Sequence, residues 1–212
     1  MTFLEILVEG FSDVPTVKAI LGRKFGLREN EHYRVHPHQG KGELPENPLA
    51  RPDRKHRGLL HQLPAKLRGY GKSLRAEYCV LVLVDADDDD CKLLKQQLVD
   101  LYRALESKPA HVLFRIAVEE TESWFIADRD AVKAGYPKAK LGKIPADPPD
   151  SVIGAWESLA KALGKKPGDC SGADKMEWAE AIAPHLDLDT PNSPSLRALI
   201  DGLRDLFSIT NQ

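Results

Sequence analysis

Five carboxylates crowd into six positions directly after the apolar run Leu81–Val84. They are Asp85, Asp87, Asp88, Asp89 and Asp90. A buried strand does not end in this much negative charge for stability, because like charges a few ångströms apart repel one another. On extended backbone Asp85 and Asp87 point the same way, and two convergent carboxylates at a strand end suit a hard cation such as Mg²⁺. The alternative is a solvated acidic turn that caps the next helix.

Two other predicted strands also end in acidic residues. The run Phe3–Val8 leads into Glu9-Gly10-Phe11-Ser12-Asp13, and His111–Val118 leads into Glu119-Glu120-Thr121-Glu122. The carboxyl ends of parallel strands share one edge of the sheet, where α/β proteins bind their ligands. Three acidic strand ends therefore predict a functional site at this edge.

The candidate metal ligands are Glu9, Asp13, Asp85 and Asp87, which would hold one or two Mg²⁺ or Mn²⁺ ions. Such an ion would polarise a phosphoryl oxygen and activate a bound water, with Glu9, Asp85 and Asp87 as the catalytic residues. Glu9 could instead act as a general acid or base, its pKa raised by its neighbours. Asp13 could equally be only a cap of the following helix.

Three further residues are candidates for supporting roles. Glu120 and Glu122 face the same way on extended backbone and diverge if a helix has begun, so a second-metal or a structural role is open. Lys41 lies between Gly40 and Gly42, where backbone amides could approach a phosphate. The Gly-x-x-x-x-Gly-Lys-Ser/Thr pattern of a P-loop is absent.

Other chemistries fail on spacing. An EF-hand loop that began at Asp85 would need glycine where Asp90 stands and glutamate where Gln96 stands. His36-x-His38 could ligate a metal, but these histidines more commonly just flank a basic loop. No Gly-x-Ser-x-Gly or Cys/His pattern indicates a nucleophilic enzyme.

The net charge of −2 conceals an uneven distribution. Between Lys18 and Arg75 there are 14 Lys/Arg against 5 Asp/Glu, a local charge of +9, so the remainder carries −11. A basic segment beside an acidic cluster is compatible with a polyanionic substrate that approaches a metal, and also with ordinary solvated surface.

Cysteine usage and hydropathy indicate a cytoplasmic protein. Cys79, Cys91 and Cys170 are odd in number and form no Cys-x-x-Cys pair, which argues against a disulfide framework or a cysteine zinc site. No apolar run approaches the length of a membrane span, and the amino terminus lacks an export signal, so no membrane partner is expected.

The elements that must position these residues alternate between strand and helix. Strands are predicted over residues 3–8, 32–36, 78–84 and 111–118, and helices over 13–26, 59–67 and 91–105, with a kink or break at Pro64. Residues 39–57 form a long Gly- and Pro-rich basic loop. The alternation predicts a doubly wound α/β fold with a largely parallel sheet.

Beyond Trp124, a packing residue, the strand signal stops. A short helix over 123–127, an irregular segment over 135–150 and helices over 151–163, 174–185 and 195–207 are expected. We therefore predict an α/β domain over residues 1–128 and a helical extension over 129–212 that packs on it as one compact unit.

Glu9-Gly10 after one strand and Asp85-Ala86-Asp87 after another resemble the Toprim domain of topoisomerases, bacterial primases and overcoming-lysogenisation-defect (OLD) nucleases. In those proteins the matching acids surround Mg²⁺ and act in phosphodiester chemistry. Glu9-x-x-x-Asp13 looks like the OLD-type nucleases, where both acids contribute to metal binding. One departure is that Asp88-Asp89-Asp90 replaces the glycine that usually follows the Asp pair.

A closer resemblance, to the Toprim-like bacterial domain-of-unknown-function family 4276, covers nearly the whole chain. It rests on five motifs: Val8-Glu9-Gly10-x-Ser12-Asp13, Gly40-Lys41-Gly42, the acidic strand end, Glu120-x-Glu122-x-Trp124 before Ala127-Asp128, and Ser193-Pro194-Ser195. The resemblance implies a metal-dependent phosphodiesterase or nuclease with a nucleic acid or nucleotide substrate, an ATPase partner and a role in bacterial defence. The alternatives are a non-catalytic Toprim-derived binding or regulatory module and a small-nucleotide hydrolase. A homo-oligomer is left open.

Overall fold

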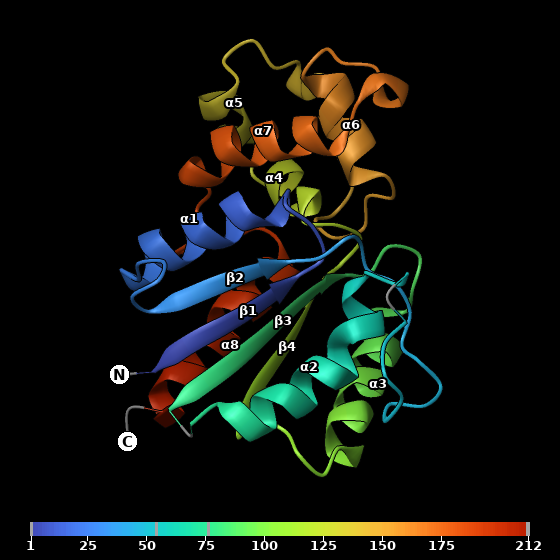
Figure 1. Cartoon of the computed structure of the whole chain (residues 1–212). Helices are drawn as coiled ribbons and strands as arrows, with labels where there is room; N and C mark the ends of the chain where they lie inside the picture. Colours follow the sequence, from blue (N-terminus) through green and yellow to red (C-terminus); the bar gives the residue numbers. More distant parts are fainter. Residues whose placement is uncertain (1, 54, 76, 211–212) are drawn as a thin grey trace.

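A parallel β-sheet forms the centre of the protein (Figure 1). The computed structural model describes residues 2–53, 55–75 and 77–210. Across the sheet of these residues the strands run in the order β2 (Tyr33–Pro37), β1 (Phe3–Val8), β3 (Tyr78–Asp85) and β4 (His111–Ala117), and every neighbouring pair is parallel. The predicted parallel α/β fold is confirmed, with strand bounds within one residue of those expected.

Helices cover both faces of the sheet. Helices α1 (Asp13–Phe25) and α8 (Pro194–Thr210) lie on one face, and α2 (Leu59–Ser73) and α3 (Cys91–Ala104) lie on the other (Figure 1). The side chains of β3 alternate between the two apolar cores, and residues 79–84 are all buried. A strand that is apolar on both sides is the sequence signature of such a central position.

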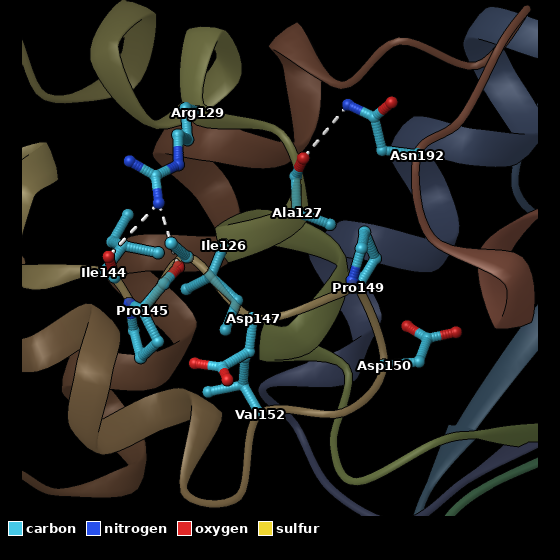
Figure 2. A pocket seen from close by; sticks show the side chains of 11 residues that line it. Ile126, Ala127, Arg129, Ile144, Pro145, Asp147, Pro149, Asp150, Val152 and Asn192 are labelled. Carbon is cyan, nitrogen blue, oxygen red and sulfur yellow. Dashed lines mark hydrogen bonds between the residues drawn. The ribbon is translucent and has the colours of Figure 1, made fainter.

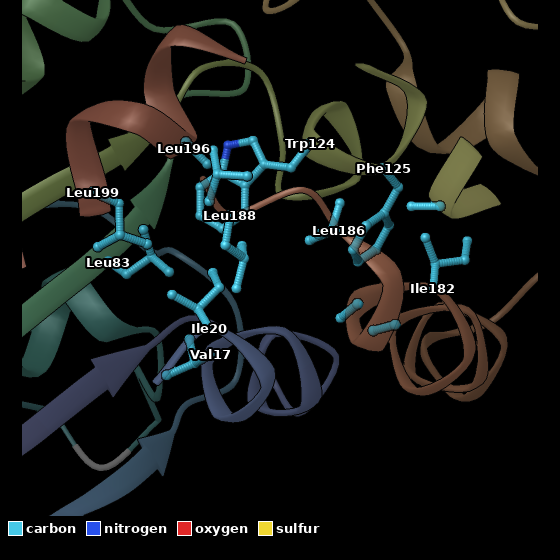
Figure 3. Close-up of a cluster of buried hydrophobic side chains, with 14 of the residues drawn as sticks. Val17, Ile20, Leu83, Trp124, Phe125, Ile182, Leu186, Leu188, Leu196 and Leu199 are labelled. Carbon is cyan, nitrogen blue, oxygen red and sulfur yellow. The ribbon is translucent and has the colours of Figure 1, made fainter. Parts of the chain in front are cut away.

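Four shorter helices gather beyond the carboxyl ends of the strands (Figure 1). They are α4 (Glu122–Ala127), α5 (Arg129–Gly135), α6 (Ala155–Ala162) and α7 (Gly172–Ile182). Figure 3 shows Trp124 of α4 and Ile182 of α7 in one apolar cluster with Ile20 of α1. The carboxyl-terminal helices thus share a core with the sheet. None of the helices in the described ranges combines the length and the apolarity that crossing a bilayer needs.

Helix α2 continues through Pro64, so the predicted break does not occur. A proline inside a helix removes one backbone donor, and here the loss is offset by a buried apolar face that contains Leu59, Leu63 and Leu67. The first amides of α2, from Leu59 and Leu60, donate to the carbonyls of Gly40 and Lys41 at 2.8 and 2.7 Å. The glycine–lysine loop therefore caps this helix.

The segment between α5 and α6 is mostly irregular, as expected, with a single 3₁₀ turn at Leu141–Lys143 among its residues. Arg129 holds it by donating to the carbonyls of Ile144 and Pro145 at 3.2 and 2.9 Å. Beside these contacts lies a small hollow of about 180 Å³, and Figure 2 shows the residues that line it. Its arginine is used in holding backbone, so we assign the hollow a structural role.

Helix α8 is fastened to the rest of the protein through the serines that open it. Asp150 accepts hydrogen bonds from the Ser193 hydroxyl at 2.7 Å and from the Ser195 N–H at 2.6 Å. The Ser195 hydroxyl accepts from the indole N–H of Trp124 at 2.8 Å. Two sequence motifs that lie seventy residues apart are thus parts of one buried contact.

Replacing Ser195 by Ala should destabilise the protein, because it leaves the buried Trp124 indole N–H without its partner. An unsatisfied buried donor costs about 1–3 kcal/mol, and each kcal/mol lowers Tm by about 2–4 °C in a chain of this size. Ser208→Ala, at an exposed position of the same helix, is the matched control for thermal unfolding. Equal Tm values for the two variants would contradict the assigned role of Ser195.

Candidate functional site

The carboxyl ends of β1, β3 and β4 are tied together by hydrogen bonds around their acidic residues. The Glu9 carboxylate accepts from the N–H of Asp85 at 2.7 Å. Beyond β3, the N–H of Ala86 donates to the carbonyl of Ala117 at 2.8 Å, and that of Asp87 donates to Glu119 at 2.9 Å. The three acidic strand ends therefore meet at one edge.

Asp13 is buried and links the first turn to the end of β4. One carboxylate oxygen accepts from the N–H of Gly10 at 2.9 Å, and the other accepts from the Thr121 hydroxyl at 3.3 Å. Asp13 is the first residue of α1, and its recorded partners are not the amides that a helix cap binds. Its side chain therefore belongs to the acidic cluster.

The acidic run after β3 divides into residues with different surroundings. Asp85 ends the strand, whereas Asp87 lies beyond it with a positive φ of 49° and a half-exposed side chain. The expectation that both side chains point the same way assumed extended backbone, and this assumption fails at Asp87, because period-two alternation ends where the backbone leaves the extended region. Asp90 accepts from the N–H groups of Lys92 and Leu93 and caps α3. The capping alternative thus holds for this last residue of the run.

Glu120 and Glu122 converge on one cation although α4 begins at Glu122. The Lys175 ammonium, from α7, lies 3.4 Å from Glu120 and 3.6 Å from Glu122. Glu120 also accepts from the backbone N–H of Trp156, in α6, at 3.2 Å. The helices beyond the strand ends therefore supply a counter-charge and a donor to the acidic edge.

Lys41 reaches the same edge from the long basic loop. Its ammonium donates to the carbonyl of Ala86 at 2.6 Å and lies 3.2 and 2.7 Å from the carboxylates of Asp87 and Asp89. The N–H of Gly40 donates to the carbonyl of Glu9 at 2.9 Å, which fixes the loop beside the first strand end. Lys41 is thus a neighbour of the acids.

The enclosed carboxyl groups are poor acids. Burial raises the pKa of Glu9 to about 8, with further increases from Asp13 and Asp87. Burial, followed by the charges of Asp13 and Glu9, raises the pKa of Asp85 well above its usual range. Burial also raises the pKa of Glu120 to about 7, and it raises the pKa values of Asp13 and Glu122 even though Lys175 opposes both increases. The negative charge of this cluster is incompletely compensated by the protein.

The donor set fits a divalent cation by its chemistry. Carboxylate oxygens are hard ligands of the kind that Mg²⁺ and Mn²⁺ prefer. A cation would supply positive charge to balance the negative charge of these acids. Within residues 2–53, 55–75 and 77–210, however, no three acidic, histidine or cysteine side chains already surround a common point at metal-binding distances. Side chains of the cluster would therefore have to move to surround an ion.

The two histidines weighed as metal ligands have structural partners. The His36 ring lies 2.5 Å from a Glu5 carboxylate oxygen, and the His38 ring lies 2.8 Å from the carbonyl of Val8. Both rings belong to the side of the molecule where β2 pairs with β1. His36 lies in β2 and His38 directly follows it, at the start of the basic loop.

Sequence reasoning missed Lys175, Thr121 and the backbone N–H of Trp156. Nothing in the local pattern around Lys175 distinguishes it from a solvated lysine on a predicted helix. Only the packing of α7 over the strand ends places its ammonium, which is 25% exposed, beside two acids. Thr121 lies within the acidic motif Glu119-Glu120-Thr121-Glu122, and its position between two glutamates is the only signal for it in the sequence.

Residues 8–204 match the model of a domain of unknown function, DUF4276. The chain belongs to this family. All five motifs that carry the resemblance lie within or at the start of the matched range, and four of them meet at the acidic edge. A search of curated proteins finds no match.

The fold of this DUF4276 protein is similar to that of the C-terminal region of the Xanthomonas campestris pv. campestris OLD protein. Structures of that region phased with mercury, platinum and iodine each give a TM-score of 0.50 at 15, 14 and 16% sequence identity. The alignments cover 99–100% of this chain and 96–99% of the other. The predicted Toprim-like fold is thereby confirmed.

The raised pKa of Glu9 predicts a pH-dependent stability in the absence of divalent cations. A carboxyl group with a folded-state pKa near 8 and an ordinary value of 4.5 stabilises the fold fully below pH 4.5, and this contribution is lost as the pH rises towards 8. Glu9→Gln removes the titration and keeps an oxygen for the Asp85 N–H. The stability of this variant relative to the unmodified chain should therefore rise between pH 5 and pH 8, by on the order of 1 kcal/mol or more of unfolding free energy, and its relative Tm should rise with it.

Asp88→Asn is the control for this measurement, because Asp88 is an exposed member of the same acidic run. Its Tm difference should stay constant across the same pH range. A flat Glu9→Gln difference would show that Glu9 titrates near its ordinary pKa.

Proposed function

We propose that this protein is a divalent-cation-dependent phosphodiesterase that acts on nucleic acid at the acidic edge of the sheet. The observation that carries the proposal is a cluster of five carboxylates at the strand ends. They belong to Glu9, Asp13, Asp85, Glu120 and Glu122, and Lys175 pairs with the last two. Such a cluster is unfavourable for folding by itself and favourable for holding a cation.

Glu9, Asp13 and Asp85 would hold the ion, with Asp87 at the exposed side of the cluster. A bound Mg²⁺ or Mn²⁺ supplies Lewis acidity towards a phosphoryl oxygen and lowers the pKa of water. Glu120 and Glu122 are held by Lys175 and by the Trp156 N–H. These contacts suit the two glutamates to a supporting role or to a second ion.

As the alternative to binding the ion, Glu9 has the properties of a general acid or base. Burial raises its pKa to about 8, so near neutral pH the group exists in both protonation states in the absence of an added cation. Its contact with the Asp85 N–H fixes one oxygen. The other oxygen is the one from which a proton would be exchanged with a substrate or a water.

Two lysines would contact the phosphate that reacts. Lys41 is held by exposed carboxylates that follow β3, and Lys175 lies beside Glu120 and Glu122, which follow β4. A phosphodiester that entered between them would meet positive charge on two sides, which favours the anionic transition state. The basic segment from Lys18 to Arg75 would add long-range attraction for a polyanion.

Asp85→Asn should abolish most cleavage of single- or double-stranded nucleic acid in the presence of Mg²⁺ or Mn²⁺. Asp85 is the central acid, so its loss should lower the rate roughly 100-fold or more, while Asp88→Asn should keep the rate of the unmodified chain. The assay would include a dinucleotide, because cleavage of the dinucleotide alone would identify a small-nucleotide hydrolase.

Calorimetric titration of the same variants with Mn²⁺ separates catalysis from binding. Cation binding that Asp85→Asn removes, without cleavage of any substrate, would favour the non-catalytic binding module. Absence of site-dependent binding at millimolar cation would overturn the proposal. An ATPase partner, implied by the family resemblance, stays a prediction.

Lys175→Gln should separate two effects of this lysine. Removing a positive charge from the cluster should tighten Mn²⁺ binding several-fold, because Lys175 no longer offsets the acids, while the rate at saturating Mn²⁺ falls because a contact with phosphate is lost. Lys138→Gln, at an exposed position, is the matched control. An unchanged rate at saturating Mn²⁺ would exclude Lys175 from contact with the substrate.

A further inference from the structure

The outer side of β4 is an open strand edge. β4 pairs with β3 and stands at the end of the strand order, away from β2 (Figure 1). The carbonyl of Ala117 faces β3, since it accepts from Ala86, so alternation turns the backbone groups of Val112, Phe114 and Ile116 outwards. Among the described residues no hydrogen-bond partner is recorded for the outward groups of Val112 and Ile116.

Two hollows follow this edge, one on each side of Arg115. The larger, of about 510 Å³, lies towards the carboxyl end of β4 between the start of α3 and the start of α8, and its apolar lining includes Ile116, Val118 and Ala198. The smaller, of about 310 Å³, lies towards the amino end beside Val112 and Gly202. Together they leave room along the edge for an extended chain, which runs about 3.3 Å per residue.

Two cations meet at the middle of the edge. Lys95, from α3, and Arg115, from β4, both donate to the carbonyl of Phe114, the arginine at 2.9 Å. Arg115 also donates to the carbonyl of Ala198 at 2.8 Å. A Cβ at Gly202 would lie 1.9 Å from the Arg115 guanidinium, so a side chain at this position would displace the guanidinium from its present place.

Neither cation has an acidic partner within 4 Å in the described part of the chain. Burial and the nearby charge of Arg115 lower the pKa of Lys95 to about 8. Burial also lowers the pKa of Arg115, against a weaker opposing effect of Asp205 and Asp201. Two partly buried positive charges held only by carbonyls would be stabilised by an anion.

We propose that the β4 edge binds an extended segment of a partner protein as an added strand, with an acidic side chain of that segment received by Lys95 and Arg115. Backbone pairing with Val112 and Ile116 would supply affinity, and the two hollows would take apolar side chains on either side of the acid. Charge disfavours a second copy of this chain, because pairing of two β4 edges about their centres would bring two such cation pairs together. This surface is separate from the acidic edge, so its test does not depend on the phosphodiesterase proposal.

The test uses fluorescein-labelled heptapeptides of alternating valine and threonine with glutamate, glutamine or lysine at the centre. In fluorescence anisotropy the full chain should bind the glutamate peptide at least tenfold more tightly than the lysine peptide, with glutamine between them. In hydrogen exchange the amides of Val112 and Ile116 should exchange quickly in the free chain and become protected when the glutamate peptide is added.

Lys95→Glu should reverse the preference in favour of the lysine peptide, and Lys138→Glu, at an exposed position outside the hollows, should leave it unchanged. Circular dichroism of each variant verifies the fold. Equal affinity for the three peptides, or no binding at millimolar concentration, would overturn the proposal and leave the two cations as residues that block edge pairing. Sedimentation that shows a dimer, with Val112 and Ile116 already protected, would overturn it in favour of a second copy.

Discussion

The burial of several carboxylates at one edge of the sheet, with the smaller repulsion among them, is the constraint around which the rest of the structure is arranged. Each acid by itself would prefer water, and the pKa values of Glu9, Asp85 and Glu120 are raised mainly by burial. The protein offsets part of this with backbone donors from Gly10, Asp85 and Trp156. The ammonium groups of Lys41 and Lys175 offset a further part of the negative charge. The negative charge that remains uncompensated would attract a cation, and this attraction is the physical basis of the proposed function.

The helices beyond the strand ends complete this edge. Without α6 and α7 the acids would lose the Trp156 N–H and the Lys175 ammonium, and they would also be exposed to water. The same helices share the apolar core that contains Ile20 and Trp124 (Figure 3). Electrostatics of the site and stability of the fold are therefore coupled, because whatever loosens these helices also rehydrates the acids.

Membership of DUF4276 and the similarity to the OLD C-terminal region describe the scaffold. A fold of this kind places strand ends, and hence any side chains carried there, at one edge. The family motifs acquire distinct physical meanings on it. The Ser193-Pro194-Ser195 motif fastens α8 to Trp124, whereas the glutamates that precede Trp124 face Lys175. One stretch of sequence thus serves both packing and the site.

Local pattern was sufficient for the strands, the parallel sheet and the acids at its edge. The apolar run before Asp85 requires burial on both faces, and acids that follow parallel strands are brought together by the sheet itself.

Three features depended on tertiary structure. The extended backbone ends before Asp87 because this residue has a positive φ, which the preceding apolar run does not predict. The continuity of α2 through Pro64 depends on the core beneath the helix. The pairing of Lys175 with Glu120 and Glu122 joins residues more than fifty positions apart, and only the packing of α7 over the strand ends decides it. Local sequence sets which groups are present at the ends of elements, and long-range packing sets which of them share an environment without water.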